Sequence, residues 1–457
     1  MAGIAFSGKR FLLTTFGCQM NQADAQRIRG ILSEIGFVET QKETEADLIL
    51  FNTCSVREHA EQRLISRVQA LTALKRKRGN LLVGIAGCMA QNHQSSLFSM
   101  TPLVDLVFGP NDLESLPELL QNASRGQTAG KFLQKGSFNG EEADGIILER
   151  PFSAFVNIIR GCTNFCSYCI VPSVRGPEVS RPPEEILKFV DALARRDVVE
   201  VTLLGQNVNA YGRDLGLEEG FVSLLESLQK LEKLRWIRFL TSHPRDFTFP
   251  AIDRISRLSK VCEQFHLPVQ AGSDRILGLM NRGYDRSGYL KLVAQFRSAI
   301  PLATISTDII CGFPSETETE FEETLQLVRE VRFESAYMYY FSPRPGTRAA
   351  GLLGQLPEET RKHRLARLIE TQNQIAWEES QKLVGKTLEV LVERTSDRTP
   401  GHLLGKTRAG RTVDFAGQNT FSGSIQKVRI DRARSWTLSG TLLDTLPVYH
   451  LNNPREA

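Results

Sequence analysis

Three cysteines, Cys162, Cys166 and Cys169, follow an apolar run from 152 to 159 with the spacing C-x3-C-x2-C. Thiolates this close in sequence can each bind a different iron of one iron–sulfur cube. A fourth cysteine would close the cube, whereas three leave one iron free for another ligand, like the open position of a catalytic metal site. The alternatives are a zinc site, for which no fourth Cys or His lies nearby, and a group of reduced core thiols. We therefore predict a 4Fe–4S cluster with one open iron at this loop.

A second set of three cysteines is spread over the first hundred residues. Short apolar runs that are typical of strands lead into Cys18, Cys54 and Cys88, and helical patterns separate them. Strand–helix–strand alternation predicts a parallel sheet, whose strands end at one shared edge. We therefore expect these cysteines to be neighbours in space and to form a second three-cysteine site. The alternative is three unrelated buried thiols, because free Cys also packs well in cores.

The composition is typical of a soluble globular protein with two or three domains: 457 residues, of which 41% are hydrophobic and 24% charged. No apolar run reaches the roughly 18 residues that a membrane helix needs, and the first ten residues contain no targeting signal. Eight cysteines without a secretory signal indicate metal binding or catalysis in a reducing compartment. We therefore expect a cytoplasmic protein that does not bind membranes.

The chain is predicted to be of the α/β class and to have three domains. Residues 9–125 alternate strand-like and helical patterns, and the Gly-rich, acidic residues 126–147 are interpreted as a linker. In residues 148–380, six strand-like runs alternate with helical patterns and end near Ile159, Leu204, Leu240, Val269, Ile310 and Phe341. Six such units are too few to close an eight-stranded barrel. We therefore predict an open (β/α)6 partial TIM barrel with its active site at the carboxyl ends of the strands.

Residues 383–446 form the third predicted domain. Four short strand-like runs with no helix between them, 387–393, 411–415, 423–430 and 436–442, predict a small β-barrel related to the oligonucleotide-binding fold. From Gly385 to Leu446, ten Lys and Arg stand against six Asp and Glu, an excess that equals the +4 net charge of the whole chain. This local excess favours attraction to a phosphate backbone, and the alternative is a solvated barrel with no role in RNA binding.

Several motifs resemble those of the radical-SAM methylthiotransferase family, and the resemblance covers nearly the whole chain. Besides the Cys162 loop with Ile170-Val171-Pro172, they are Gly17-Cys18-Gln19-Met20-Asn21, Asn52-Thr53-Cys54-Ser55-Val56-Arg57, Ala86-Gly87-Cys88-Met89-Ala90, Leu267-Pro268-Val269-Gln270-Ala271-Gly272-Ser273, Arg282-Gly283-Tyr284 and Ser342-Pro343-Arg344-Pro345-Gly346-Thr347. The resemblance implies an N-terminal cluster domain, a radical-SAM barrel and a C-terminal TRAM domain that binds the substrate. Departures from the family pattern at Thr163, Ser315 and Lys406 affect no predicted cluster ligand.

The Gly17–Asn21 motif and the Arg-Gly-Cys sequence that opens the cluster loop resemble the members that modify tRNA. The resemblance implies a transferase that adds a methylthio group to C2 of N6-isopentenyladenosine at position 37, in the anticodon stem-loop. It implies two 4Fe–4S clusters, one on each cysteine triad, and two S-adenosylmethionine (SAM) molecules per turnover. One SAM methylates sulfur held at the first cluster, and the other is cleaved at the second to give the radical that removes the C2 hydrogen. We also expect a flavodoxin or ferredoxin as electron donor and a monomeric enzyme.

Two alternatives remain open at this stage. One is a methylthiotransferase for threonylcarbamoyladenosine in tRNA or for a ribosomal protein, and the other is a two-cluster electron-transfer or RNA-binding protein without catalysis. Electron carriers normally keep every iron of a cluster ligated, so two three-cysteine sites argue against the second alternative.

Six residues outside the triads are candidates for binding SAM: Tyr168, Arg175, Gly205, Gln206, Asn207 and Gln270. The backbone of Tyr168 is a candidate to pair with adenine, and Gln206 and Asn207 are candidates to hold the methionine moiety. Packing of an aromatic ring and helix capping are the respective alternatives. Arg175 is a candidate for a carboxylate or phosphate. Cys262 and Cys311 are interpreted as buried thiols without a role, and His243 and His266 are left unassigned.

Overall fold

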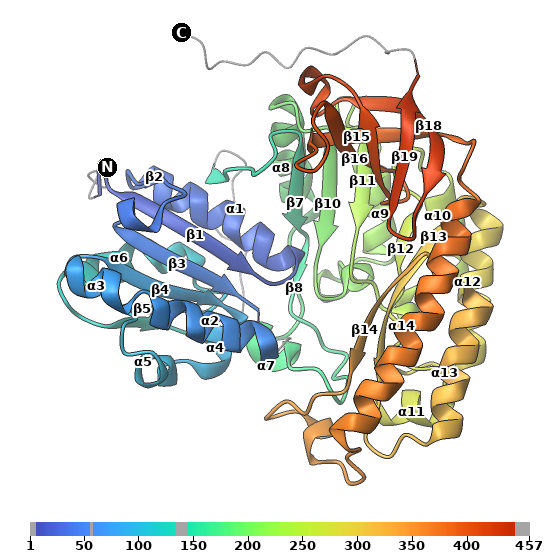
Figure 1. Ribbon diagram of the computed structural model, residues 1–457, viewed down its shortest axis with the longest axis horizontal. Helices are drawn as coiled ribbons and strands as arrows, with labels where there is room; N and C mark the ends of the chain where they lie inside the picture. The colour runs from blue at the N-terminus through green and yellow to red at the C-terminus, as the bar shows by residue number, and fades with distance from the viewer. Residues whose placement is uncertain (1–5, 55–57, 134–144, 444–457) are drawn as a thin grey trace.

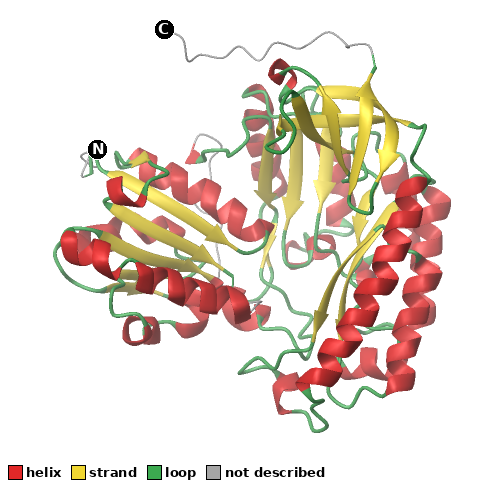
Figure 2. Ribbon diagram, viewed as in Figure 1, coloured by secondary structure: helices red, strands yellow, loops and turns green. Residues whose placement is uncertain are grey.

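The computed structural model describes residues 6–54, 58–133 and 145–443, which form three bodies that pack against one another (Figure 1). Helices cover both faces of the first sheet and the outer face of the central barrel, and the last body consists mainly of strands (Figure 2). The predicted α/β class, with a parallel N-terminal domain, a partial barrel and a C-terminal small β-barrel, is confirmed. No helix in these described ranges is long and apolar enough to cross a membrane.

The N-terminal body is a six-stranded parallel sheet in the order β2-β1-β3-β4-β5-β6. Its strands are β1 (Arg10–Phe16), β2 (Val38–Glu39), β3 (Leu48–Thr53), β4 (Leu82–Gly87), β5 (Leu106–Phe108) and β6 (Ala129–Lys131). Its helices are α1 (Gln19–Glu34), α2 (Glu58–Ala70), α3 (Thr72–Lys77), α4 (Cys88–His93), α5 (Ser96–Met100) and α6 (Leu116–Ser124). Every residue of β3 is buried, as a central parallel strand covered on both faces requires.

The sheet has three short strands that the sequence analysis does not predict. Strand β6 lies inside the expected linker, 126–147, so the sheet continues into that segment. Residues 134–144 of the expected linker lie outside the described residues.

The central body is the six-stranded partial barrel predicted from the sequence. Its strands are β7 (Ser153–Asn157), β10 (Glu200–Leu204), β11 (Trp236–Phe239), β12 (Gln264–His266), β13 (Thr304–Cys311) and β14 (Ser335–Tyr340). The outer helices are α8 (Pro183–Arg195), α9 (Gly220–Leu228), α10 (Phe249–Ser256), α12 (Arg286–Ala299), α13 (Glu318–Val331) and α14 (Glu358–Gln381). All strand pairs in the sheets β11-β10-β7 and β12-β13-β14 are parallel, and a bridge between Ile237 and Val261 joins these sheets. The barrel is therefore open between β7 and β14, and α1 packs against β7 at this opening (Figure 1).

The C-terminal body is a closed barrel in the order β15-β16-β17-β19-β18. Its strands are β15 (Thr387–Thr395), β16 (His402–Thr407), β17 (Thr412–Ala416), β18 (Ile425–Ala433) and β19 (Thr437–Leu442). The prediction of four strands is wrong, because β16 is a strand as well. Its sequence, HLLGKT, has a glycine in the middle and no clear alternation of apolar residues, so β16 lacks the sequence pattern of a strand.

The C-terminal barrel is docked on the amino ends of the central strands through the turn between β16 and β17. Arg238, on β11, donates to Glu200 on β10 (Nε to Oε1, 2.6 Å) and, from Nη1 and Nη2, to the backbone carbonyls of Arg408 (2.6 Å) and Thr407 (2.8 Å). In return Arg408 makes a two-oxygen ion pair with Glu263. Arg238 and Glu200 are both buried, so water cannot solvate either charge if the other is removed. The turn is therefore held by an ion pair whose loss would be costly.

Arg238→Met is expected to cost about 3–5 kcal/mol of stability, because it leaves the Glu200 carboxylate buried without its cation. Thermal unfolding followed by circular dichroism measures the loss. The matched control is Arg254→Met, which removes ion pairs to Glu219 and Glu226 at the surface and should cost less than about 1 kcal/mol. Equal losses for the two variants would contradict this account of the docked turn.

Candidate active site

The first cysteine triad lies at one edge of the N-terminal sheet, as predicted. Phe16 at the end of β1 pairs with Thr53 at the end of β3, and Thr53 pairs with Gly87 at the end of β4. The three strand ends are thus paired in register, and each cysteine follows one of them. The Cys54 thiol is hydrogen-bonded to both Cys18 and Cys88. Parallel pairing in register therefore places three thiols from distant parts of the sequence side by side.

The thiols of this triad differ in acidity. The hydrogen bond with Cys54, helped by the charge of Arg175, lowers the pKa of Cys18 to about 6 and that of Cys88 to about 7, against the opposing effect of burial. Hydrogen bonding to both neighbours raises the pKa of Cys54 well above its usual value. Thiolates are the form that binds metals, so the surroundings favour the ligand form of two of the three residues.

Arg175 is the least expected residue at the first triad. We predicted it among the SAM-binding residues, because it lies six residues beyond Cys169. In the structure it ends the short helix α7 (Val171–Arg175), where its Nε donates to Cys88 Sγ (3.3 Å) and its Nη2 to Asp24 Oδ2 (2.9 Å). Its side chain is only 2% exposed. The barrel thus supplies the cation that faces the thiols of the other domain.

Two asparagines complete the surroundings of the first triad. Asn21 Nδ2 donates to Asn52 Oδ1 (3.2 Å), and Asn52 Nδ2 donates to the backbone carbonyl of Asn21 (2.7 Å). Asn21 Oδ1 also lies 3.5 Å from Cys18 Sγ. This pair ties the first turn of α1 to β3 beside the thiols. Both asparagines belong to the cysteine motifs, but no feature of the sequence predicts that they bind each other.

The second triad lies on the loop after β8 (Ile159–Arg160), which pairs with β9 (Val179–Ser180). Gly161, with φ +77°, starts this loop, and a Cβ there would overlap the carbonyl oxygen of Pro177. Its N–H donates to the side-chain oxygen of Gln206 (2.6 Å). Gln206, predicted to bind SAM, therefore anchors the cluster loop in this structure.

Burial dominates the chemistry of the second triad. It raises the pKa of Cys162 to about 11 and that of Cys169 to about 12. Buried thiols of this kind lose their protons when a metal cation binds them. The described residues contain no group of three His, Cys, Asp or Glu side chains placed to hold a single metal ion. Cysteine ligands of a four-iron cube lie further apart than those of one ion, so this finding is compatible with an iron–sulfur cluster.

Arg282 reaches the second triad from the loop after α11 (Asp274–Leu279). Its Nη1 donates to Cys166 Sγ (3.2 Å) and to the Tyr168 hydroxyl (3.3 Å), and its Nη2 donates to the carbonyl of Pro268 (2.8 Å). Each triad thus has one buried arginine that contacts a thiol. The motif Arg282-Gly283-Tyr284 is visible in the sequence, but its distance of more than 100 residues from Cys166 hides this contact.

Several buried polar atoms beside the second triad have no hydrogen-bond partner among the described residues. They are Asn207 Oδ1, Gln270 Oε1, His243 Nε2 and Ser167 Oγ. Buried groups of this kind are normally satisfied, so they indicate a molecule that binds here. Gln270 also has the left-handed φ of +76°, a strained backbone that is typical of functional sites. These atoms fit a polar ligand such as SAM.

The other predicted SAM-binding residues lie around the same site with different surroundings. Asn207 is held through Nδ2 by Asp246 (2.7 Å), which leaves its oxygen for a ligand. The Tyr168 ring is packed in the adjoining core, so only its backbone is a candidate for contact with SAM. A Cβ at Gly205 would overlap the side chain of Ile159, so this glycine permits close packing against the strand that leads to the cluster loop. Cys262 and Cys311 are buried, as predicted.

Helix α7 joins the two triads. It begins two residues after Cys169, and its last residue, Arg175, contacts Cys88. In the same region Cys88, Ile170 and Val174 form one buried cluster where α4 packs against α7. A helix rises about 1.5 Å per residue, so the five residues of α7 span about 7.5 Å between the cluster loop and Arg175. One short helix at the junction of the domains therefore links the two sites.

Models of known families match three successive parts of the chain. The uncharacterized protein family UPF0004 matches residues 10–109, the radical SAM superfamily matches 156–328, and the TRAM domain matches 381–443. Among solved structures, a radical S-adenosylmethionine methyltransferase from Kitasatospora setae, with cobalamin and a [4Fe-4S] cluster bound, has the same kind of fold. The TM-score is 0.51 at 12% identity over 75% of this chain and 74% of the other.

Relatives of nearly the same length are much more similar. A tRNA-2-methylthio-N(6)-dimethylallyladenosine synthase of Moorella thermoacetica is 45% identical over 95% of this chain and 99% of its own. The enzyme of that name from Pelotomaculum thermopropionicum is 44% identical over 95% of this chain and 98% of its own. The chain therefore belongs to the same family, the tRNA-2-methylthio-N(6)-dimethylallyladenosine synthases of the radical SAM superfamily. The family resemblance inferred from the motifs is confirmed.

Proposed function

We propose that this chain adds a methylthio group to C2 of N6-isopentenyladenosine in tRNA, the product that the names of its relatives give, and that the target nucleoside is at position 37. The observation that carries the proposal is the pair of three-cysteine sites at the two ends of α7. One site can hold the sulfur to be transferred and the other can start the radical reaction, so the two halves of the chemistry take place at adjacent sites.

The chain's own residues divide between these tasks. Cys162, Cys166 and Cys169 bind one 4Fe–4S cluster, and together with SAM this cluster supplies a radical able to remove hydrogen from the unactivated C2–H bond. Asn207 and Gln270 orient SAM through their unsatisfied buried oxygens. Arg282 fixes the Cys166 thiolate and neutralises part of its charge.

The first triad has the second task. Cys18, Cys54 and Cys88 would hold a second 4Fe–4S cluster, which would carry the sulfur for transfer, and one of two SAM molecules per turnover would supply the methyl group. Arg175 stabilises the thiolates and, through its bond to Asp24, holds the first triad against the barrel. A positive charge at this place opposes the charge of a cluster bound by three thiolates.

The C-terminal barrel suits the RNA part of the substrate. On β18, Lys427 and Arg429 alternate with buried residues and point to solvent, and Arg432 is exposed near the end of the strand. Cations along one exposed strand can contact successive phosphates of an anticodon stem-loop. For the remaining partners we propose a flavodoxin or ferredoxin as electron donor, and for the enzyme itself a monomeric state and a cytoplasmic location, where tRNA and such reductants occur together.

Nucleoside analysis tests the reaction. Expressed in a bacterial strain that lacks its own enzyme of this family, the chain is expected to restore 2-methylthio-N6-isopentenyladenosine in tRNA, measured by mass spectrometry of tRNA digests. The Cys162→Ala variant is the control and should restore none, because its second cluster loses a ligand. Methylthio groups on threonylcarbamoyladenosine, or on no tRNA nucleoside, would refute the proposal.

A further inference from the structure

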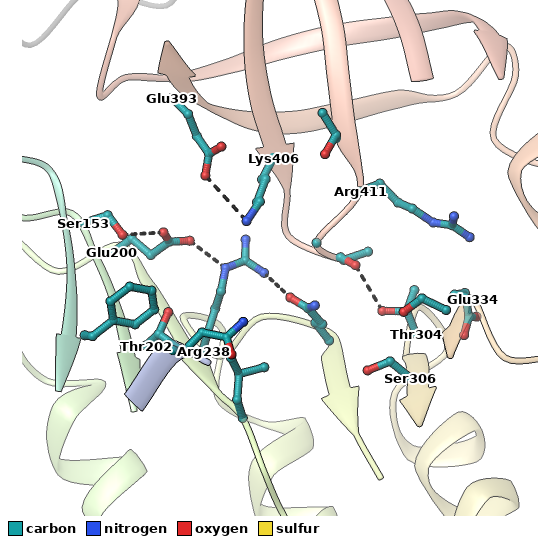
Figure 3. A pocket seen from close by; sticks show the side chains of 18 of the residues that line it. Ser153, Glu200, Thr202, Arg238, Thr304, Ser306, Glu334, Glu393, Lys406 and Arg411 are labelled. Atoms are coloured by element: carbon teal, nitrogen blue, oxygen red, sulfur yellow. Dashed lines mark hydrogen bonds and ion pairs between the residues drawn. The ribbon is translucent and has the colours of Figure 1, made fainter. Parts of the chain in front are cut away.

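A cavity of about 670 Å³ lies inside the open barrel, between α1, the inner face of the strands and the docked C-terminal barrel. Both edge strands of the barrel line it, Ser153 and Phe155 from β7 and Ser335 and Tyr337 from β14, so it lies at the opening of the barrel. Figure 3 shows its wall toward the C-terminal barrel, where Lys406 reaches Glu393 and Arg238 reaches Glu200. The cavity lies on the side of the barrel away from the cluster loops, yet it extends toward them.

The strand register shows how far it extends. Tyr337, which lines the cavity, pairs with Asp308 in the second half of β13. Leu240, which also lines it, directly follows β11 and bonds through its N–H to Leu203 (3.2 Å), at the end of β10. The next residues are the strand-end loops that hold Asn207 and Thr241. The inner end of the cavity therefore lies directly beneath the proposed SAM site.

One strip of the cavity wall is apolar. Phe155 and Leu240 are both partly buried and pack together on a cluster formed by Met20, Ala23 and Leu204, at the contact between α1 and the barrel. Three glutamines of α1, Gln19, Gln22 and Gln26, line the cavity beside this strip. On β14, Tyr337 is 52% exposed and lines the cavity, and its ring contacts His266 edge-on. An aromatic face of this kind can stack on a base.

The cations around the cavity are committed to other partners. Arg238 is bound to Glu200 and to the docked turn, and Arg150 and Lys406 both pair with Glu393. Arg411 donates through Nη1 to the backbone carbonyl of Ser435, and the negative charge of Glu334 acts on it. An N6 substituent that carries a carboxylate, such as threonylcarbamoyl, would thus meet an apolar strip and amides instead of a free positive charge. A hydrocarbon substituent fits the strip.

We propose that this cavity receives the target nucleoside and that Phe155 and Leu240 bind its N6-isopentenyl group, while Tyr337 stacks on the adenine. The inference rests on the proposed function and adds the residues that choose the substrate. Contact of the five-carbon chain with Phe155 and Leu240 removes apolar surface of both partners from water, a gain that an unsubstituted adenosine cannot provide. The strip therefore selects tRNA that has already been prenylated, so the prenyl-transfer reaction must precede this one.

The test compares two synthetic anticodon stem-loop RNAs that differ only in the isopentenyl group at position 37. Their affinities for the full chain with both clusters reconstituted are measured by fluorescence anisotropy without SAM, so that no turnover occurs. Wild type should bind the isopentenyl RNA at least about tenfold more tightly, and Leu240→Ser and Phe155→Ser should each remove most of this difference. Affinity for the unmodified RNA should stay within about twofold, because phosphate contacts carry it.

Two further variants serve as controls. Leu240→Met keeps the apolar volume and should keep the preference. Leu302→Ser makes the same kind of change at an exposed position, 73% accessible, and should change neither affinity. Equal losses for both RNAs, or an unchanged preference in both serine variants, would overturn the assignment. If wild type still methylthiolates the isopentenyl RNA in that case, only the pocket is refuted, whereas no methylthiolation by wild type would refute the proposed function itself.

Discussion

Replacing Cys162, Cys166 and Cys169 together with Ala is expected to halve the iron content of the reconstituted chain, from about eight irons to about four. In the proposed function each triad holds its own cluster, and the first triad follows strands of a different sheet, which has its own hydrophobic cores. The variant should also lose all cleavage of SAM, because the loop beside the unsatisfied polar atoms of Asn207 and Gln270 would then hold no cluster. Colorimetric iron analysis after anaerobic reconstitution measures the first effect, and formation of 5′-deoxyadenosine measures the second.

The double variant Cys262→Ala, Cys311→Ala is the matched control. Both thiols are buried, at 1% and 0% exposure, in cores that belong to neither triad. This variant should keep the full iron content and the full rate of SAM cleavage. A wild-type chain that holds only about four irons would contradict the two-cluster reading, since each proposed cube contains four.

The positions of both triads could be predicted because they depend on backbone rules. The second triad is local in sequence, and the first follows from the rule that parallel strands share an edge. The register of Phe16, Thr53 and Gly87 shows how closely that rule holds here. The number of strands in the central barrel followed in the same way from counting the alternation of apolar and helical runs.

The direction of individual side chains could not be predicted. Gln206 and Arg175 are polar residues close to the cluster loop, so both were reasonable candidates for SAM. Their partners, Gly161 and Cys88, are decided by how the barrel packs on the N-terminal sheet, which no local pattern records. Arg282 was missed for the same reason.

The cavity was missed for a related reason. Phe155 and Leu240 look like ordinary strand residues in the sequence. Only the opening of the barrel between β7 and β14, together with α1 packed beside β7, leaves their side chains at the wall of a cavity. A sequence pattern gives the face of the sheet on which a residue lies, but it does not show whether that face is filled.

Replacing Cys18, Cys54 and Cys88 together with Ala should abolish methylthio transfer and leave SAM cleavage intact. The alanine variant of the second triad, in contrast, should lose SAM cleavage. The first-triad variant should lose methylthio transfer to tRNA completely, since it has no place for the sulfur. It should still form 5′-deoxyadenosine under a strong reductant, because the second triad, Arg282 and the unsatisfied polar atoms proposed to bind SAM lie in the barrel. Before reduction, wild type incubated with SAM should release a methylthio group on acid treatment, and the variant should release none. Mass spectrometry of the volatile thiol and of the tRNA nucleosides gives both measurements.

Arg175→Met separates the role of the thiols from that of their surroundings. It keeps all six cluster cysteines but removes the cation that contacts Cys88 and binds Asp24. Because burial of a thiolate cluster without its counter-charge is costly, we expect this variant to reconstitute the first cluster incompletely and to transfer less methylthio group, with normal formation of 5′-deoxyadenosine. The Cys18, Cys54, Cys88 triple alanine variant should transfer no methylthio group in the same assay. If that triple variant still produced methylthio-adenosine above the level of the barrel-triad variant, sulfur would come from elsewhere, and the first triad would be structural.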